Sequence, residues 1–170
     1  MLKMIEWMHK QLEPNLRDMP EAIKRGIQEK YEEDTVLLTL KSDHIRHEGL
    51  KFTSSDNNTF YQSWLVLTDK RIIAARNSST FKEFVSTPYA MLEPLSILFS
   101  FADGMLTFNE KNGKSYKVEF LKYADEYFEE LDITLREMAD RAQHKKCPHC
   151  GREIEQESNF CPGCGRDISL

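Results

Sequence analysis

The sequence predicts an α+β protein, built as a small antiparallel β-barrel or sandwich with helices before it, a capping helix after it and a separate metal-binding tail. Three observations predict this order. Between residues 34 and 120, apolar residues alternate with polar ones in short runs separated by turns, which indicates about seven strands. From Ala124 the apolar period becomes helical. All four cysteines then lie within residues 147–164, in two Cys-x-x-Cys pairs.

The N-terminal segment, residues 1–33, contains two predicted helices. In residues 1–12 apolar side chains recur at helical spacing until Glu13-Pro14 ends the pattern, and this amphipathic helix packs either on its own domain or on another chain. The second helix begins with Asp18 and Glu21, the form of a capping box with Pro20 in the first turn. It runs to about Tyr31 and places Ile23 and Ile27 on the same face as Tyr31.

The first half of the predicted sheet starts with a strand at residues 35–40. Residues 41–59 are polar, and they predict a long loop or a ragged hairpin. The buried runs at residues 64–67 and 72–75 then predict two strands that meet across the tight turn at Thr68-Asp69-Lys70.

The second half of the sheet is predicted from two short strands, at residues 81–89 and 95–101, followed by a hairpin. Asn112-Gly113 favours a two-residue hairpin turn, because both residues adopt positive φ easily. The long helix at residues 124–142 closes the domain, with the pairs Asp132–Arg136 and Glu137–Arg141 on its exposed side.

Composition narrows the class of protein. The chain has 170 residues, a formal charge of −5 and 40% hydrophobic residues, enough for one core and a small appendage. An acidic chain is not the usual binder of a phosphate backbone, so nucleic acid is not the partner that we expect. No apolar run is long enough for a membrane span or a signal peptide, which leads us to expect a cytoplasmic protein. In the reducing cytosol the cysteines favour metal ligation over disulfides.

The stretch WLVLTDKRIIAAR, residues 64–76, resembles the strand-turn-strand signature of bacterial pleckstrin-homology-like (PH-like) domains. The segment TPYAML at residues 87–92 and the closing helix agree with this resemblance, which covers about residues 20–143. It implies a PH-like domain at residues 34–143, between the N-terminal helices and the tail. It also suggests a homo-oligomer, with the helix at residues 1–12 as the candidate contact. The motif itself is mostly structural, because Thr68 and Asp69 bond nearby backbone while Lys70 and Arg71 keep the turn solvated.

The tail, CPHCGREIEQESNFCPGCGRDI at residues 147–168, carries the strongest chemical signal. Its two Cys-Pro-x-Cys-Gly segments predict one structural zinc ion held by Cys147, Cys150, Cys161 and Cys164. The pattern resembles short zinc ribbons, including Phe160 before the second pair. Four protein ligands leave no open position for catalysis, and His149 is expected to point outward.

The remaining clusters are weaker. The His-x-x-His of residues 43–48 reads as a solvated loop rather than a metal site, and Lys41, Arg46 and Lys51 form a basic loop diluted by Asp43 and Glu48. The tail holds two arginines against four carboxylates, which does not suit a phosphate-binding surface. No catalytic motif is present, so we expect no enzyme.

We therefore predict a non-enzymatic binding or scaffolding protein whose partner is another protein. The alternative is a peripheral membrane protein that binds anionic lipid through the basic loop. The third possibility is a zinc-ribbon protein associated with nucleic acid.

Overall fold

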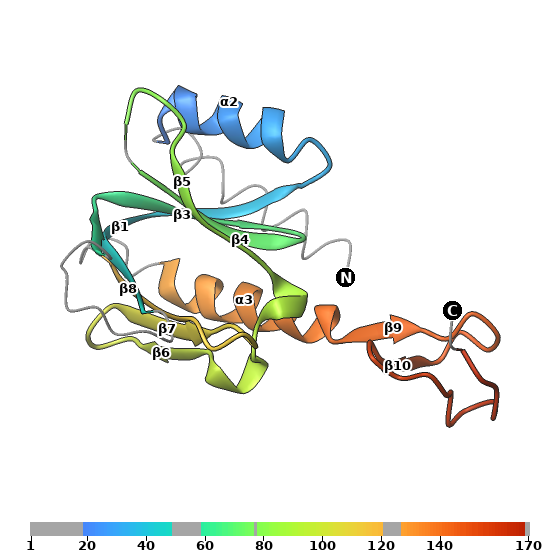
Figure 1. The fold of residues 1–170 in the computed structure, drawn as a ribbon. Helices are drawn as coiled ribbons and strands as arrows, with labels where there is room; N and C mark the ends of the chain where they lie inside the picture. Colours follow the sequence, from blue (N-terminus) through green and yellow to red (C-terminus); the bar gives the residue numbers. More distant parts are fainter. Residues whose placement is uncertain (1–18, 49–58, 77, 121–126, 169–170) are drawn as a thin grey trace.

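The computed structural model describes residues 19–48, 59–76, 78–120 and 127–168 (Figure 1). Its body is one antiparallel sheet in the order β5-β4-β3-β1-β8-β7-β6, with β2 paired to β1 beside this path. The strands are β1 (Val36–Glu48), β2 (Thr59–Tyr61), β3 (Ser63–Thr68), β4 (Arg71–Arg76), β5 (Glu83–Pro88), β6 (Leu98–Ser100), β7 (Met105–Asn109) and β8 (Ser115–Phe120). The predicted α+β class is confirmed.

Strand β1 belongs to both halves of the sheet. Its first half pairs with β3 and its second half with β8, and the register shifts between Ser42 and His44 where the strand passes from one half to the other. Of the two predictions for residues 41–59, a long loop or a ragged hairpin, the structure shows the hairpin, because residues 44–46 of β1 pair antiparallel with residues 59–61 of β2. Pairing on both sides, with Ser42 and Ile45 buried, holds a polar sequence in an extended conformation. Residues 49–58 lie outside the described part.

The two predicted hairpins have different outcomes. β3 and β4 pair as expected, with Leu67 opposite Ile72. The β7–β8 hairpin forms in the predicted place, but Glu110 and Lys114 close a three-residue loop instead of a two-residue one. Within this loop only Gly113 has a positive φ, at 88°, and its N–H donates to the carbonyl of Glu110. This is a type I turn followed by a one-residue bulge, which needs a single glycine.

Helix α3 (Phe128–Ala142) packs against the inner face of the sheet and fills the main core. Phe128, Leu131 and Leu135 are fully buried against strand residues such as Leu106 and Val118. The predicted pairs Asp132–Arg136 and Glu137–Arg141 both form on its outer side. The helix begins at Phe128 rather than near Ala124, and residues 121–126 are not described.

Helix α2 (Glu21–Lys30) covers the opposite face of β3 and β4. Ile23 and Ile27 of the helix, and Tyr31 just after it, are buried there in a second apolar cluster with Trp64, Val66, Ile73 and Ala75. The helix starts at Glu21 with Pro20 as its N-cap residue, which has no side-chain cap bond, and Asp18 of the predicted capping box lies outside the described residues. The helix predicted at residues 1–12 lies outside the described residues.

The turn between β3 and β4 anchors the chain after α2. Thr68 Oγ1 accepts hydrogen bonds from the N–H groups of Lys70 and Arg71, as the motif predicted. Arg71 is not simply solvated, because its Nε lies 2.8 Å from Asp34 Oδ2 and its guanidinium lies over the Tyr31 ring. The Asp34 side chain is only 3% exposed, so this ion pair is part of the packed structure.

The C-terminal tail extends from the end of α3 (Figure 1). Strand β9 (His144–Lys146) follows the helix after Gln143, and it pairs with β10 (Glu153–Glu155) in a separate two-stranded sheet. The first cysteine pair lies in the loop between these strands, and the second pair follows β10. In the part of the chain that the structure describes, no helix has the length and apolar character that crossing a membrane requires.

Candidate metal centre

The two cysteine pairs form loops of the same backbone conformation. In the first loop the N–H of Gly151 donates to the carbonyl of Cys147, and in the second the N–H of Gly165 donates to that of Cys161, both at 2.9 Å. Each loop is closed by a return bond, from Cys147 N–H to Arg152 O and from Cys161 N–H to Arg166 O. The glycines have φ of 70° and 69°, a conformation that glycine adopts without strain. The repeated Cys-Pro-x-Cys-Gly-Arg sequence thus gives two equivalent knuckles.

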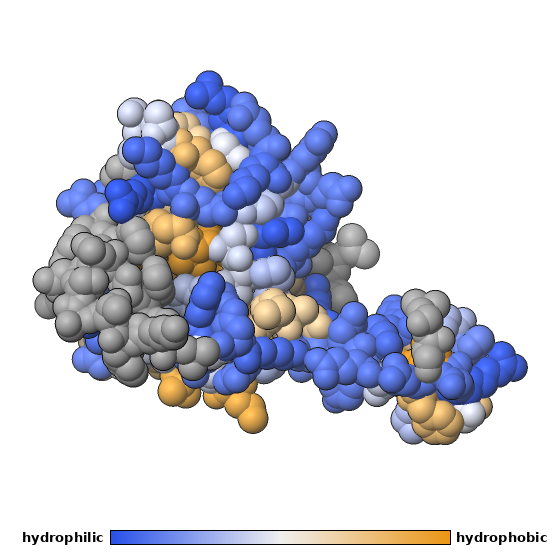
Figure 2. All heavy atoms as spheres, in the orientation of Figure 1, coloured by the Kyte–Doolittle hydropathy of each residue, from blue (hydrophilic) through white to orange (hydrophobic). Residues whose placement is uncertain are grey.

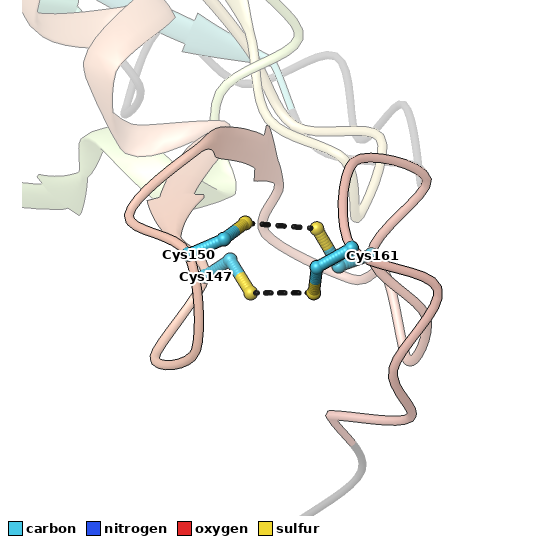
Figure 3. Close-up of side chains that lie close together, drawn as sticks. Cys147, Cys150 and Cys161 are labelled. Atoms are coloured by element: carbon cyan, nitrogen blue, oxygen red, sulfur yellow. Dashed lines mark hydrogen bonds between the residues drawn. The ribbon is translucent and has the colours of Figure 1, made fainter.

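The knuckles aim four sulfurs at one point. All four Sγ atoms lie within 4.8 Å of one another, with Cys147 to Cys164 at 3.8 Å and Cys150 to Cys161 at 3.6 Å. Figure 3 shows the side chains of Cys147, Cys150 and Cys161 pointing toward one another, with these two sulfur pairs joined by dashed lines. A zinc–sulfur bond of about 2.3 Å implies a tetrahedral S–S edge of about 3.8 Å. The spacing fits a zinc ion and is far too long for disulfides.

The pKa values of the thiols also suit the binding of a cation. Desolvation would raise the pKa of Cys147, but hydrogen bonds from the N–H groups of His149 and Cys150 lower it to about 6. At Cys150 a hydrogen bond from the N–H of Arg152 favours the thiolate, yet desolvation and the neighbouring sulfurs raise the pKa to about 11. The first thiolate thus forms easily, and further ones are opposed by its charge. A divalent cation at the centre removes that repulsion and allows all four thiolates.

The tail has almost no core besides these sulfurs. Its buried cluster consists of Cys147, Ile154, Cys161 and Ile168, with Cys164 packed against it. Two isoleucines cannot hold so short a segment, because an apolar core of this size does not offset the entropy of ordering the chain. Bonds to the metal are therefore the main source of the tail's stability.

An arginine from each knuckle contacts the other knuckle. The side chain of Arg152, from the first knuckle, covers Gly163 in the second so closely that an added Cβ would lie 2.5 Å from its Nε. Arg166, from the second knuckle, places Nη1 3.2 Å from His149 Nδ1 in the first. His149 is exposed and is not among the clustered cysteine ligands, as its place inside the first knuckle led us to expect.

The family comparison decides the nature of this segment. Residues 146–168 match the model of a zinc-ribbon domain family. The tail is a zinc ribbon. The match, the four clustered sulfurs and the absence of any competing ligand among the described residues support one structural zinc ion. No curated protein matches the sequence.

Comparison with solved structures gives distant likenesses. The chain is similar to a structure titled "Vav1 inhibited by an allosteric inhibitor: Vav1 inhibitors block GEF activity", with 11% identity and a TM-score of 0.43 over 90% of this chain and 42% of the other. For "Autoinhibited Vav1" the values are 10%, 0.41, 97% and 32%. The chain thus spans less than half of these proteins, and likeness at this level supports no conclusion about function.

The zinc ribbon meets the body through a small contact. Gln156 N–H donates to the carbonyl of Gln143 at 2.6 Å. Lys111 Nζ, in the β7–β8 loop, donates to Gln143 Oε1 at 2.9 Å and lies 3.7 Å from a carboxylate oxygen of Glu157. The ribbon therefore extends α3 without a flexible spacer, yet few interactions tie it to the sheet.

For the other candidate residues, the structure describes mainly the backbone. Lys41 and Arg46, predicted in a basic loop, lie on strand β1, while Lys51 lies outside the described residues. The backbone of His44 and His47 is also part of β1, opposite Glu119 and Tyr116 of β8, and their side chains are not described. The segment that suggested a basic loop is a strand as far as Glu48.

Two features were missed by sequence reasoning. Glu110 is 6% exposed and accepts hydrogen bonds from Thr87, Tyr116 and Asn112; burial alone would raise its pKa, but these bonds lower it. No local pattern indicates a buried carboxylate at a hairpin turn. The second feature is an exposed apolar surface beside β6, for which the uncharged run at residues 94–102 was an available signal.

Proposed function

We propose that the protein is a non-enzymatic binding or scaffolding protein whose zinc ribbon docks onto another protein. The observation that carries the proposal is the closed metal centre. Because four cysteines fill the tetrahedral positions of a zinc ion, no position remains for water or substrate. The ion then acts as a structural centre that fixes the two knuckles.

The outer surface of the ribbon is available for contact. Both knuckles are exposed at Pro148, His149 and Pro162, and the Phe160 ring is 54% exposed just before the second pair. An exposed aromatic residue on a rigid loop is the type of side chain that commonly anchors protein interfaces. The carboxylates around it disfavour a phosphate backbone as the partner.

The lipid-binding alternative has less support. It rested on a basic loop, and two of its three cations, Lys41 and Arg46, lie on β1 instead. Co-sedimentation with anionic vesicles tests it directly, since salt-sensitive binding that is lost in Lys51→Glu would favour the lipid alternative over our proposal.

The proposal is tested by affinity capture from the native host with the immobilised full-length protein, followed by reconstitution with each purified partner. We expect Cys161→Ser and Phe160→Ser to lose the same partner while the body stays folded. Glu129→Ala, on the exposed side of α3, is the matched control and keeps it. A partner set unchanged by both ribbon variants would refute docking through the ribbon.

A further inference from the structure

Strand β6 forms an open edge of the sheet. In the described sheet it pairs only with β7, so the backbone groups on its other side have no strand partner. Three apolar side chains beside this edge are exposed, Leu95 by 97%, Leu98 by 64% and Phe101 by 52%. Figure 2 shows hydrophobic atoms protruding below β6 and the adjoining turn η3 (Pro94–Ser96). Phe99 points inward instead, with its ring 5.0 Å from that of Phe128.

Apart from the shortness of β6, which has three residues, this edge lacks the features that usually protect one. Proteins guard exposed edges with charged side chains or proline, because unpaired backbone groups recruit other strands. Residues 95–102 contain neither. At the opposite edge of the sheet, β5 ends in Pro88, and its Glu83 binds both Lys30 and the Tyr31 hydroxyl of the α2 segment. The contrast between the two edges indicates that β6 is covered by something in its working state.

The charges at the ends of the uncharged run indicate what covers it. Glu93 precedes the run and Asp103 follows it; both are exposed, and within the described residues neither forms an ion pair. An antiparallel two-fold pairing of two copies along β6 would place the Glu93 end of one copy beside the Asp103 end of the other, twice. Like charges brought together in this way are destabilising. A segment with basic ends meets favourable charge at the same two places.

We propose that β6 binds an extended segment of a partner protein, with an uncharged apolar centre and a Lys or Arg at each end, as an added strand. Main-chain hydrogen bonds to β6 supply affinity, and contacts with Leu95, Leu98 and Phe101 supply specificity. This inference rests on the proposed binding function and names a second contact, on the sheet rather than on the zinc ribbon.

The test uses the full-length zinc-loaded protein and two fluorescent peptides that share an alternating Val/Thr centre and carry either Lys or Glu at both ends. Anisotropy is expected to show the Lys-ended peptide binding at least about tenfold more tightly than the Glu-ended one. Leu98→Lys weakens binding about tenfold, since it removes an apolar contact and guards the edge. The double variant Glu93→Lys with Asp103→Lys reverses the preference between the peptides.

Ile133→Lys is the matched control, because Ile133 is 54% exposed but lies on α3. The inference is overturned if the Lys-ended peptide does not bind, or if Ile133→Lys weakens it as much as Leu98→Lys. It is also overturned if light scattering shows a dimer that Leu98→Lys converts to a monomer, since a second copy would then occupy the edge. Partner capture by the ribbon is measured separately from peptide binding to β6. The β6 inference can therefore fail while the proposed function of the ribbon holds.

Discussion

Removing zinc should unfold the ribbon and leave the body folded. The ribbon's apolar core is two isoleucines, Ile154 and Ile168, whose burial contributes about 3–6 kcal/mol in total. Metal binding in comparable segments contributes about 10–16 kcal/mol, so the ion is the larger part of the ribbon's stability.

The effect on the body follows from the contact between the two parts. The bond from Gln156 to Gln143 contributes about 1 kcal/mol. The ion pair between Lys111 and Glu157, whose side chains are 38% and 88% exposed, contributes less than about 1 kcal/mol. Loss of both should lower the melting temperature of the body by only about 5 °C.

Calorimetry before and after chelation measures this, with a colorimetric chelator to count the zinc released and Cys161→Ser as the genetic equivalent. Hydrogen exchange should show protection lost at residues 144–168 and retained in α3 and the sheet. A fall of the body's melting temperature several times larger than predicted would refute the reasoning, because it would mean that the ribbon stabilises α3. Retained protection of the ribbon after complete metal removal would also refute the reasoning, because it would mean that the ribbon folds without zinc.

Three further predictions concern the body. Arg71→Met should destabilise it by about 2–3 kcal/mol in urea unfolding, because it removes the closer of the two cations beside the buried Asp34 carboxylate and leaves only Lys70 Nζ, 3.8 Å from Oδ1; an unchanged midpoint would contradict the role given to the Arg71–Asp34 pair. Gly26→Ala should lower the free energy of unfolding by about 1–3 kcal/mol, since the added Cβ would lie 2.1 Å from Phe81 Cγ. The double variant with Phe81→Ala should lose less stability than the sum of the two single variants, because the smaller side chain relieves the clash. Hydrogen bonds lower the pKa of Glu110 in the folded protein, so the ionised carboxylate stabilises the fold at pH values above its unfolded pKa, and this stabilisation is lost as pH falls through the lower folded pKa. Wild type should therefore lose more stability than Glu110→Gln as pH falls below about 4.5. Equal losses would show that Glu110 does not cause the pH dependence.

Local patterns predicted much of this molecule because the interactions that set them are local. The spacing of the cysteines, with glycine after each pair, predicted the two knuckles and the clustering of the four sulfurs in one step. The period of residues 128–142 predicted α3, and the paired runs around Thr68 predicted the β3–β4 hairpin, because one face of each is buried in the same core.

The errors occurred where distant residues decide the structure. Polar residues 41–48 form a longer strand than their sequence indicates because β8, far along the chain, pairs with one edge, while the nearby β2 pairs with the other. Asn112-Gly113 indicated a turn correctly but not its length, since Glu110 is held by Thr87 and Tyr116 and continues the strand pairing by one residue. Partners of this kind cannot be read from local sequence.

The closed four-sulfur centre is the central claim, and X-ray absorption at the zinc edge tests it most directly. For purified full-length protein we predict one zinc per chain, with four sulfur neighbours at about 2.3 Å and no lighter ligand. A spectrum with three sulfurs and a nitrogen or oxygen, or a protein without stoichiometric zinc whose four cysteines titrate freely, would contradict the account.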